Sequence, residues 1–102
     1  MTLRLRNRWS YRGDGGWDWE AFLDDGGSGE LRRVEFVDYL LHETFPEPRR
    51  RVAEPEGGFR LAAAGFGDFD LKAFVHFADG TRKRLVHTLE LRQQAALGIS
   101  KD

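Results

Sequence analysis

Two short segments of the sequence place polar and aromatic side chains next to residues that constrain or free the backbone. The first, residues 42–48 (His-Glu-Thr-Phe-Pro-Glu-Pro), ends in two prolines that prevent a strand from continuing. The second, residues 65–69 (Gly-Phe-Gly-Asp-Phe), sets aromatic rings among glycines, which let a ligand approach the backbone closely. Loops of this kind display side chains at low entropic cost, so we predict one ligand site built from both segments.

The side chains of these segments suit a neutral amide. A slot between the rings of Phe45 and Phe66 favours a flat, uncharged group. The Thr44 hydroxyl and a backbone N–H near Phe66 can satisfy the donor and the acceptor of an amide, each bond contributing about 1 kcal/mol. A charged ammonium group fares badly in the same slot, since it would lose its hydration there and also has no acceptor to offer the backbone donor.

Three motifs together resemble the YEATS domain in its prokaryotic form. They are residues 41–48 (Leu-His-Glu-Thr-Phe-Pro-Glu-Pro), residues 65–69 and residues 86–91 (Val-His-Thr-Leu-Glu-Leu), and the resemblance runs from roughly residue 17 to residue 91. It implies an immunoglobulin-like sandwich whose ligand, an acylated lysine, binds among loops at one end. The partner it implies is therefore an acylated lysine on a protein or peptide.

The resemblance also assigns roles within the two segments. Phe45 and Phe66 match the stacking aromatics, and Thr44 matches the hydroxyl that bonds the acyl amide. His42 matches the residue that orients this hydroxyl, and Phe69 matches a residue at the back of the pocket.

Four more residues complete the predicted ligand site. Gly65, Gly67 and Asp68 belong to the second loop, and the backbone near Gly67 is a candidate donor to the acyl carbonyl. Eukaryotic members that read histones often supply a further aromatic ring from the loop that here reads Gly-Asp-Gly-Gly, residues 13–16. Trp17 is its nearest substitute.

The bulk properties limit the chain to one globular domain. It has 102 residues, 40% of them hydrophobic, and no cysteine, which removes disulfides and thiolate metal sites. No apolar run approaches the ~20 residues of a membrane span, and the N-terminus lacks the apolar core of a secretion signal. We therefore expect a cytoplasmic protein without a membrane partner.

Alternation of apolar and polar residues predicts an all-β fold, an immunoglobulin-like β-sandwich with a loop-end ligand pocket. We expect the sandwich to span residues 1–91, with residues 92–102 as a tail that forms a short helix or is disordered. A bulge near Phe36 explains a change of phase there, and Asp79-Gly80 predicts a tight hairpin. The expected strands cover residues 2–12, 17–24, 31–41, 59–63, 69–77 and 85–91, and residues 49–58 are expected to be irregular.

The same alternation predicts the core. Its expected members are Trp9, Trp19, Tyr39, Leu41, Leu71, Val75 and Leu89. Phenylalanines on strands are usually core residues, so the sequence adds Phe22, Phe36, Phe59, Phe74 and Phe77.

Enzyme signatures are weak, and we predict neither catalysis nor a cofactor. The histidines at 42, 76 and 87 lack the spacing of metal ligands. His42, Thr44 and Asp68 imitate a hydrolytic triad, but threonine is a poor nucleophile without special activation.

Alternative binding functions stay open. Phe45, Phe66 and Phe69 beside Asp68 could form a cage for methylated lysine by cation–π attraction. The arginines of the first strand, with those at 49–51, could bind nucleic acid. A module for protein–protein interaction or for another small ligand is also open. A net charge of −1 argues that nucleic acid is at most a weak, non-specific partner.

Overall fold

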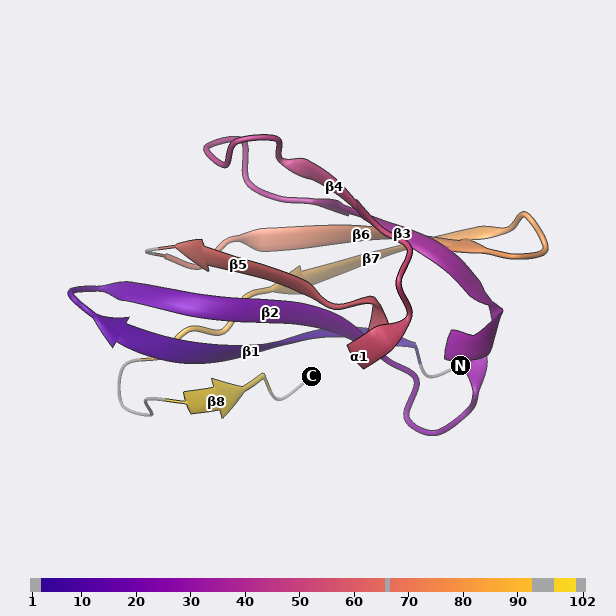
Figure 1. The fold of residues 1–102 in the computed structure, drawn as a ribbon, viewed down its shortest axis with the longest axis horizontal. Helices are drawn as coiled ribbons and strands as arrows, with labels where there is room; N and C mark the ends of the chain where they lie inside the picture. The colour runs from indigo at the N-terminus through magenta and orange to yellow at the C-terminus, as the bar shows by residue number, and fades with distance from the viewer. Residues whose placement is uncertain (1–2, 66, 93–96, 101–102) are drawn as a thin grey trace.

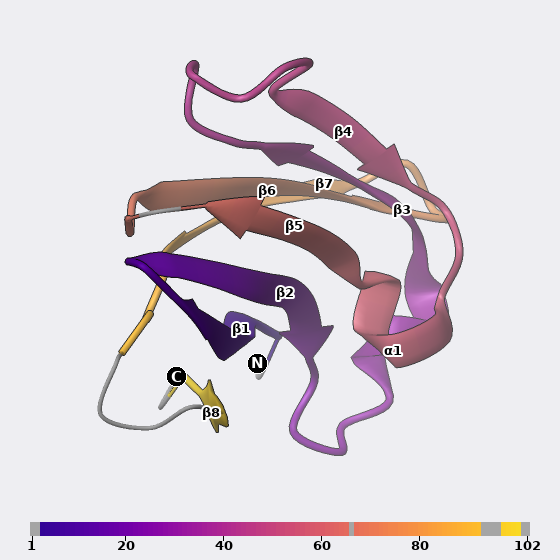
Figure 2. The same cartoon turned by 60° about the vertical axis from the view of Figure 1, so that its left-hand side comes forward.

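The computed structural model describes residues 3–65, 67–92 and 97–100, which form two antiparallel sheets packed face to face (Figures 1 and 2). One sheet has the strand order β5-β2-β1-β8 and the other β4-β3-β6-β7. The strands are β1 (Arg4–Gly13), β2 (Gly16–Asp24), β3 (Val34–Leu40), β4 (Arg49–Val52), β5 (Leu61–Gly65), β6 (Asp70–Phe77), β7 (Arg82–Thr88) and β8 (Leu97–Ile99). This architecture confirms the predicted all-β sandwich.

Strict alternation in the sequence becomes one buried face on each strand. Along β6, residues Leu71, Ala73, Val75 and Phe77 point between the sheets, and their neighbours point outward. Burial of these inward side chains holds the sheets together because it removes apolar area from water. All seven residues expected in the core are at most 6% exposed.

Two local predictions are confirmed. The β3–β6 ladder shifts register between Val34 and Phe36, which is the predicted bulge. The Asp79-Gly80 turn joins β6 to β7, with the amide of Phe77 donating to the carbonyl of Thr81 at 2.9 Å.

Residues 49–65 differ from the prediction of an irregular stretch followed by a strand over 59–63. Residues 49–52 form β4, which pairs with the edge of β3, and a short helix α1 (Glu56–Phe59) precedes β5. Gly58 adopts φ 78°, and a Cβ there would lie 2.3 Å from the carbonyl oxygen of Leu23, so only glycine fits. The buried Tyr39 hydroxyl donates to the carbonyl of Phe59 at 2.6 Å and anchors the turn.

The start of the expected third strand also differs, because residues Glu30–Arg33 form a 3₁₀ turn, η1, ahead of β3. None of the helices in the described part of the chain is long and apolar enough to cross a lipid bilayer.

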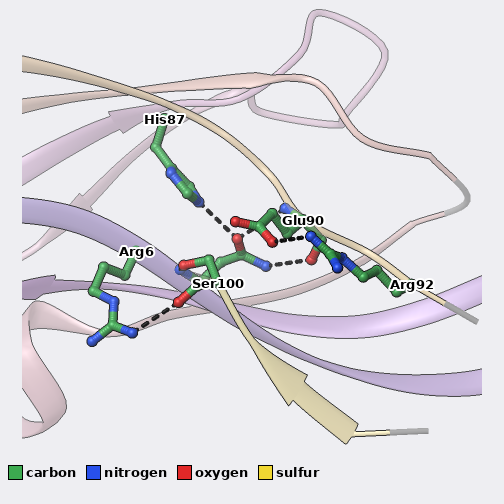
Figure 3. Close-up of polar contacts among 6 residues, drawn as sticks. Arg6, His87, Glu90, Arg92 and Ser100 are labelled. Carbon is green, nitrogen blue, oxygen red and sulfur yellow. Dashed lines mark hydrogen bonds and ion pairs between the residues drawn. The ribbon is translucent and has the colours of Figure 1, made fainter. Parts of the chain in front are cut away.

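The tail corrects the prediction of a short helix or disorder after residue 91. β8 pairs with β1, and the fully buried Ser100 follows it; residues 93–96 lie outside the described part. The Ser100 hydroxyl accepts a hydrogen bond from the backbone amide of Asn7 at 2.9 Å. The Ser100 carbonyl accepts one from the Arg6 guanidinium at 2.8 Å (Figure 3). β8 is stabilised by these bonds and by pairing with an edge of β1 that would otherwise be unpaired. Local sequence propensity does not reveal such a strand.

The outer face of the first sheet explains the arginines of β1. Three cross-strand ion pairs join β1 to β2: Arg6–Asp24 at 2.8 Å, Arg8–Glu20 at 3.8 Å and Arg12–Asp18 at 3.3 Å. These pairs neutralise the face, so it offers little attraction to nucleic acid.

Three phenylalanines assigned to the core lie outside it. Phe22 is buried on the outer side of β2 beneath Arg8, whose guanidinium carbon is 4.5 Å from the ring centroid. Phe36 and Phe74 are half-buried on the outer face of the second sheet. Because alternation shows only that two faces differ, a phenylalanine on the polar face is mistaken for core. Phe59 and Phe77 do belong to the core cluster.

Candidate functional site

The β3–β4 loop and the end of β5 lie at the same end of the sandwich in both views (Figures 1 and 2). The loop begins where β3 ends and is closed at its base by the amide of Leu41, which donates to the carbonyl of Pro48 at 2.8 Å. A turn inside the loop is closed by the amide of Phe45, which donates to the carbonyl of His42 at 3.0 Å. These bonds hold the predicted polar residues at the mouth of the sandwich.

Arg50 fixes the proline part of the loop. Its guanidinium donates to the carbonyls of Pro46 (2.9 Å) and Glu47 (3.1 Å). Glu47 has φ 50°, a left-handed conformation that costs energy in a residue other than glycine. The arginine therefore stabilises a strained turn and reduces the mobility of the residues on either side.

His42 and Thr44 form a hydrogen-bonded pair with a defined direction. The backbone N–H of Thr44 lies 3.2 Å from His42 Nδ1, and the Thr44 hydroxyl lies 2.9 Å from the same atom. A backbone N–H can only donate, so Nδ1 carries no proton and must also accept from the hydroxyl. The lone pairs of Thr44 Oγ1 are left free to accept a bond from a ligand.

Three aromatic rings pack behind this pair. The centroids of Phe45 and Phe69 are 5.4 Å apart, and Trp19 meets both rings edge-on at 6.4 Å and 5.9 Å. Phe45 and Phe69 are half-buried and also pack against the core, so each serves the core and the site together. Trp19 is 2% exposed, and its indole N–H has no hydrogen-bond partner in the described part of the chain.

Gly65 gives the rings room at the end of β5. A Cβ on Gly65 would lie 3.6 Å from Phe45 Cζ and 3.8 Å from Trp19 Nε1, so any side chain there would fill the space between the loops. The residues around this space enclose a cavity of about 470 Å³, open to solvent. Its lining comprises His42, Thr44, Phe45, Pro46, Ala64, Gly65, Gly67, Asp68 and Phe69.

The cavity gathers seven of the nine residues predicted for the ligand site. Phe66 lies outside the described residues. Trp17 is 7% exposed and pairs with Gly65 in the β2–β5 ladder, so it lies beside the cavity without lining it. Its ring packs on Tyr11 with centroids 5.2 Å apart, and its indole N–H donates to the carbonyl of Arg92 at 3.3 Å.

Sequence reasoning missed Pro46 and Ala64 as lining residues and Arg50 as the residue that fixes the loop. The signal for Pro46 was present, because it follows Phe45 in the same loop. The sequence does not single out Arg50, since its neighbours at 49 and 51 are also arginines. Only the fold determines which of the three side chains bonds the carbonyls of the loop.

The described residues contain no group of three or more histidine, aspartate or glutamate side chains placed to hold a metal ion. Nor does a carboxylate of these residues bond to His42, so the pair with Thr44 has no third member of a triad.

Comparison with protein families decides the classification. The model of the prokaryotic YEATS domain matches residues 17–90. The chain belongs to this family. The matched segment contains both cavity loops, including every residue that lines the cavity.

Relatives in yeasts are similar over part of their length. Transcription initiation factor TFIID subunit 14 of Schizosaccharomyces pombe is 34% identical over 70 residues, which are 65% of this chain and 28% of that protein. Protein AF-9 homolog of Kluyveromyces lactis is 29% identical over 70 residues, 68% of this chain and 31% of that protein. The YEATS chain described here thus spans under a third of the length of these relatives.

Solved structures share the fold over nearly the whole chain. The Yaf9 YEATS domain bound to H3K27ac superposes with a TM-score of 0.75 at 24% identity, covering 97% of this chain and 79% of that one. The Yaf9 YEATS domain recognising an H3K122suc peptide gives a TM-score of 0.66 at 19% identity, covering 97% and 80%. At these identities the likeness shows the YEATS sandwich itself.

Proposed function

We propose that this YEATS domain is a non-catalytic binding module whose loop-end cavity takes the acylated side chain of a lysine, of the acetyl or crotonyl type. The observation that carries the proposal is the His42–Thr44 pair, which leaves the lone pairs of the Thr44 hydroxyl free to accept a bond in a cavity that aromatic rings also line. An acyl-lysine amide has an N–H to donate to Thr44 Oγ1, and its acyl group is flat and uncharged. The Yaf9 domain, which has the same fold, is bound to H3K27ac in its structure.

The aromatic lining supports a neutral acyl group. Phe45 and Phe69 offer ring faces and edges within one cavity, and Phe66 would add a second stacking face if it closes the slot as the family resemblance implies. Partners of this YEATS domain are then acylated proteins or peptides. The cytoplasmic location expected from the sequence stays a prediction.

The position of Asp68 in the cavity supports methylated lysine as a second candidate ligand. Its carboxylate lines the same cavity as the two phenylalanine rings, and this combination also suits the cation of a methylated lysine. The two candidates differ in charge, so one set of peptides separates them.

Binding to a fluorescent peptide with one central lysine tests the proposal. We expect the acetyl and crotonyl forms to bind and the unmodified form to fail, because the cavity cannot hydrate an ammonium. Stronger binding of the trimethyl form would support the cage instead. Equal binding of modified and unmodified peptides would show that the cavity does not recognise the modified lysine.

Thr44→Val is the decisive variant because it keeps the shape of the side chain and removes the acceptor. The bound amide N–H is then buried without a partner, which weakens binding by about 1–3 kcal/mol, or about 5–150-fold. Thr88→Val is the matched control, since the Thr88 hydroxyl is exposed on β7 and bonds Asp70. Phe66→Ala should remove a stacking face and weaken binding of the peptide by about 1–3 kcal/mol, by analogy with the stacking of bases on aromatic side chains.

Mass spectrometry of the acetylated peptide after long incubation tests the absence of catalysis. The peptide should keep its acetyl group. Loss of the acetyl group that depends on Thr44 would make the His42–Thr44 pair a nucleophile and its base, contrary to the proposal.

A further inference from the structure

The outer face of the second sheet carries a group of positive charges that do not line the loop-end cavity. Strand register places Arg84 beside Phe74 and Arg82 beside His76, with β7 at the edge of the sheet. On the other side of Phe74, Leu40 lies between Lys72 and Arg49. We call this surface the basic face; Arg51 on it is paired with Asp38, and its remaining cations are Arg49, Lys72, Arg82 and Arg84.

These four cations lack carboxylate partners. In the described part of the chain no ion pair or hydrogen bond joins any of them to an aspartate or glutamate. Arg49 has only a longer-range attraction to Asp38. The outer face of the first sheet is the opposite case, since its three central arginines are each paired across strands. Like charges that outnumber their counter-charges destabilise the free protein, and an anionic partner would relieve that cost.

The centre of the basic face is apolar and hollow. A cavity of about 530 Å³ lies over Phe74 and is bordered by Arg49, Arg82 and Arg84, with Asp38 as the only carboxylate in its described lining. Leu40 also lines it. Val86 follows along β7 and is 50% exposed, one of two large apolar side chains that the described residues leave open to water. The surface therefore presents apolar contact area inside a ring of cations.

The Arg51–Asp38 pair on this face shows how an arginine here can bind the carboxylate of a partner. Arg51 holds Asp38 with two parallel bonds, Nε to Oδ1 at 2.8 Å and Nη2 to Oδ2 at 3.1 Å. The Arg51 guanidinium carbon also lies 4.0 Å from the ring centroid of Phe36. Guanidinium groups that rest on a sheet with aromatic rings are well placed for such two-pronged contacts.

We propose that the basic face is a docking site for an acidic peptide segment of a partner protein, in which carboxylates alternate with apolar side chains. Carboxylates bind Arg82, Arg84, Arg49 and Lys72, and an apolar side chain enters the cavity over Phe74. This site is separate from the loop-end cavity and does not depend on its ligand.

A peptide fits this surface better than nucleic acid does. Phe74 and Leu40 in the cavity, with the exposed Val86 farther along β7, favour contact with apolar side chains, which a phosphate backbone lacks. Asp38 lies within the face and repels a continuous line of phosphates, and the net charge of −1 removes long-range attraction for a polyanion.

Fluorescence anisotropy with a labelled short peptide that alternates glutamate with leucine tests the proposal. We expect saturable binding that weakens as salt rises from about 50 to about 200 mM. Replacing every glutamate by glutamine should abolish it, and replacing every leucine by serine should weaken it. Amide shifts in NMR spectra should change on the basic face, at Arg49, Phe74 and Arg84, and stay unchanged at Thr44.

The variant Arg82→Gln/Arg84→Gln should lose about tenfold in affinity, as two charge-assisted contacts are removed. Arg4→Gln/Arg60→Gln is the matched control: it removes the same charge from exposed arginines on β1 and beside β5, and it should bind like the parent. If the first variant is less stable, Arg49→Gln/Lys72→Gln on the other side of Phe74 replaces it. Melting temperatures check that each variant is folded.

Three results would overturn the proposal: equal loss in both arginine variants, unchanged binding of the glutamine peptide, or tighter binding of single- or double-stranded DNA than of the acidic peptide at the same salt. Acetyl-lysine peptide binding by Arg82→Gln/Arg84→Gln should equal that of the parent, so the loop-end cavity is scored separately.

Discussion

Asn7 is the one fully buried side-chain amide in the described chain, and its replacement by alanine should be among the most damaging single changes. Its Oδ1 accepts from His87 Nε2 at 2.7 Å and from the amide of Glu90 at 3.0 Å. Its Nδ2 donates to the carbonyl of Glu90 at 2.9 Å. These bonds tie His87 of β7 and the residues that follow it to β1; Figure 3 labels the two partners, His87 and Glu90.

The magnitude follows from the number of bonds. Asn7→Ala removes three side-chain hydrogen bonds, one of them buried and two part-buried, and leaves the group at the other end of each bond without this partner. At about 1 kcal/mol per bond, with a further penalty for each group left in a dry site, the loss is about 3–6 kcal/mol. Domains of this size are stable by about 5–15 kcal/mol, so the variant approaches the unfolding limit.

Urea unfolding followed by tryptophan fluorescence measures the effect. Ser100→Ala, which removes the hydroxyl that accepts the backbone amide of Asn7, should cost about 1 kcal/mol. Ser10→Ala, on the outer side of the same strand, is the control and should change the midpoint little. A loss below about 1 kcal/mol in Asn7→Ala, at an unchanged slope, would show that water or relaxation replaces the network and would refute the reasoning.

Two further predictions concern pH and the tail. The Arg51 hydrogen bonds hold the pKa of Asp38 below its ordinary value, so this pair stabilises the fold above about pH 4 and the contribution is lost as pH falls through the lowered pKa. Asp38→Asn should therefore flatten the fall in urea midpoint below about pH 4; a fall identical to the parent's would show that other carboxylates cause it. A Cβ on Gly98 would lie 2.0 Å from Trp9 Cζ2, so Gly98→Ala should displace β8, lower stability by about 1–3 kcal/mol and red-shift the fluorescence of Trp9. An unchanged spectrum and midpoint would mean that β8 contributes nothing to the packing of Trp9.

The sequence predicts those parts of the fold that neighbouring residues determine. Alternation along β6 and the Asp79-Gly80 turn specify a hairpin whose two strands are adjacent in sequence. β4 and β8 escape prediction because each is a short edge strand that exists only through its partner, β3 or β1. Asn7 gave a signal that was not used: it interrupts the inward series of Leu3, Leu5 and Trp9 with a polar side chain, and an inward amide requires a network.

The same distinction applies within the candidate site. His42 and Thr44 are two residues apart, so their hydrogen bond is a local feature that the sequence can suggest and the fold only has to preserve. Gly65 lines the same cavity as His42 and Thr44 because the β2–β5 ladder places the end of β5 there. The resemblance to a family, rather than the spacing of the residues, predicted that these residues share one site. Arg50 depends on both the local sequence and the fold. Its bonds to the carbonyls of Pro46 and Glu47 hold the loop before any ligand arrives, so the hydroxyl of Thr44 needs little ordering on binding. The affinity for the proposed acyl-lysine ligand should then depend on the fit of its acyl group rather than on closure of the loop.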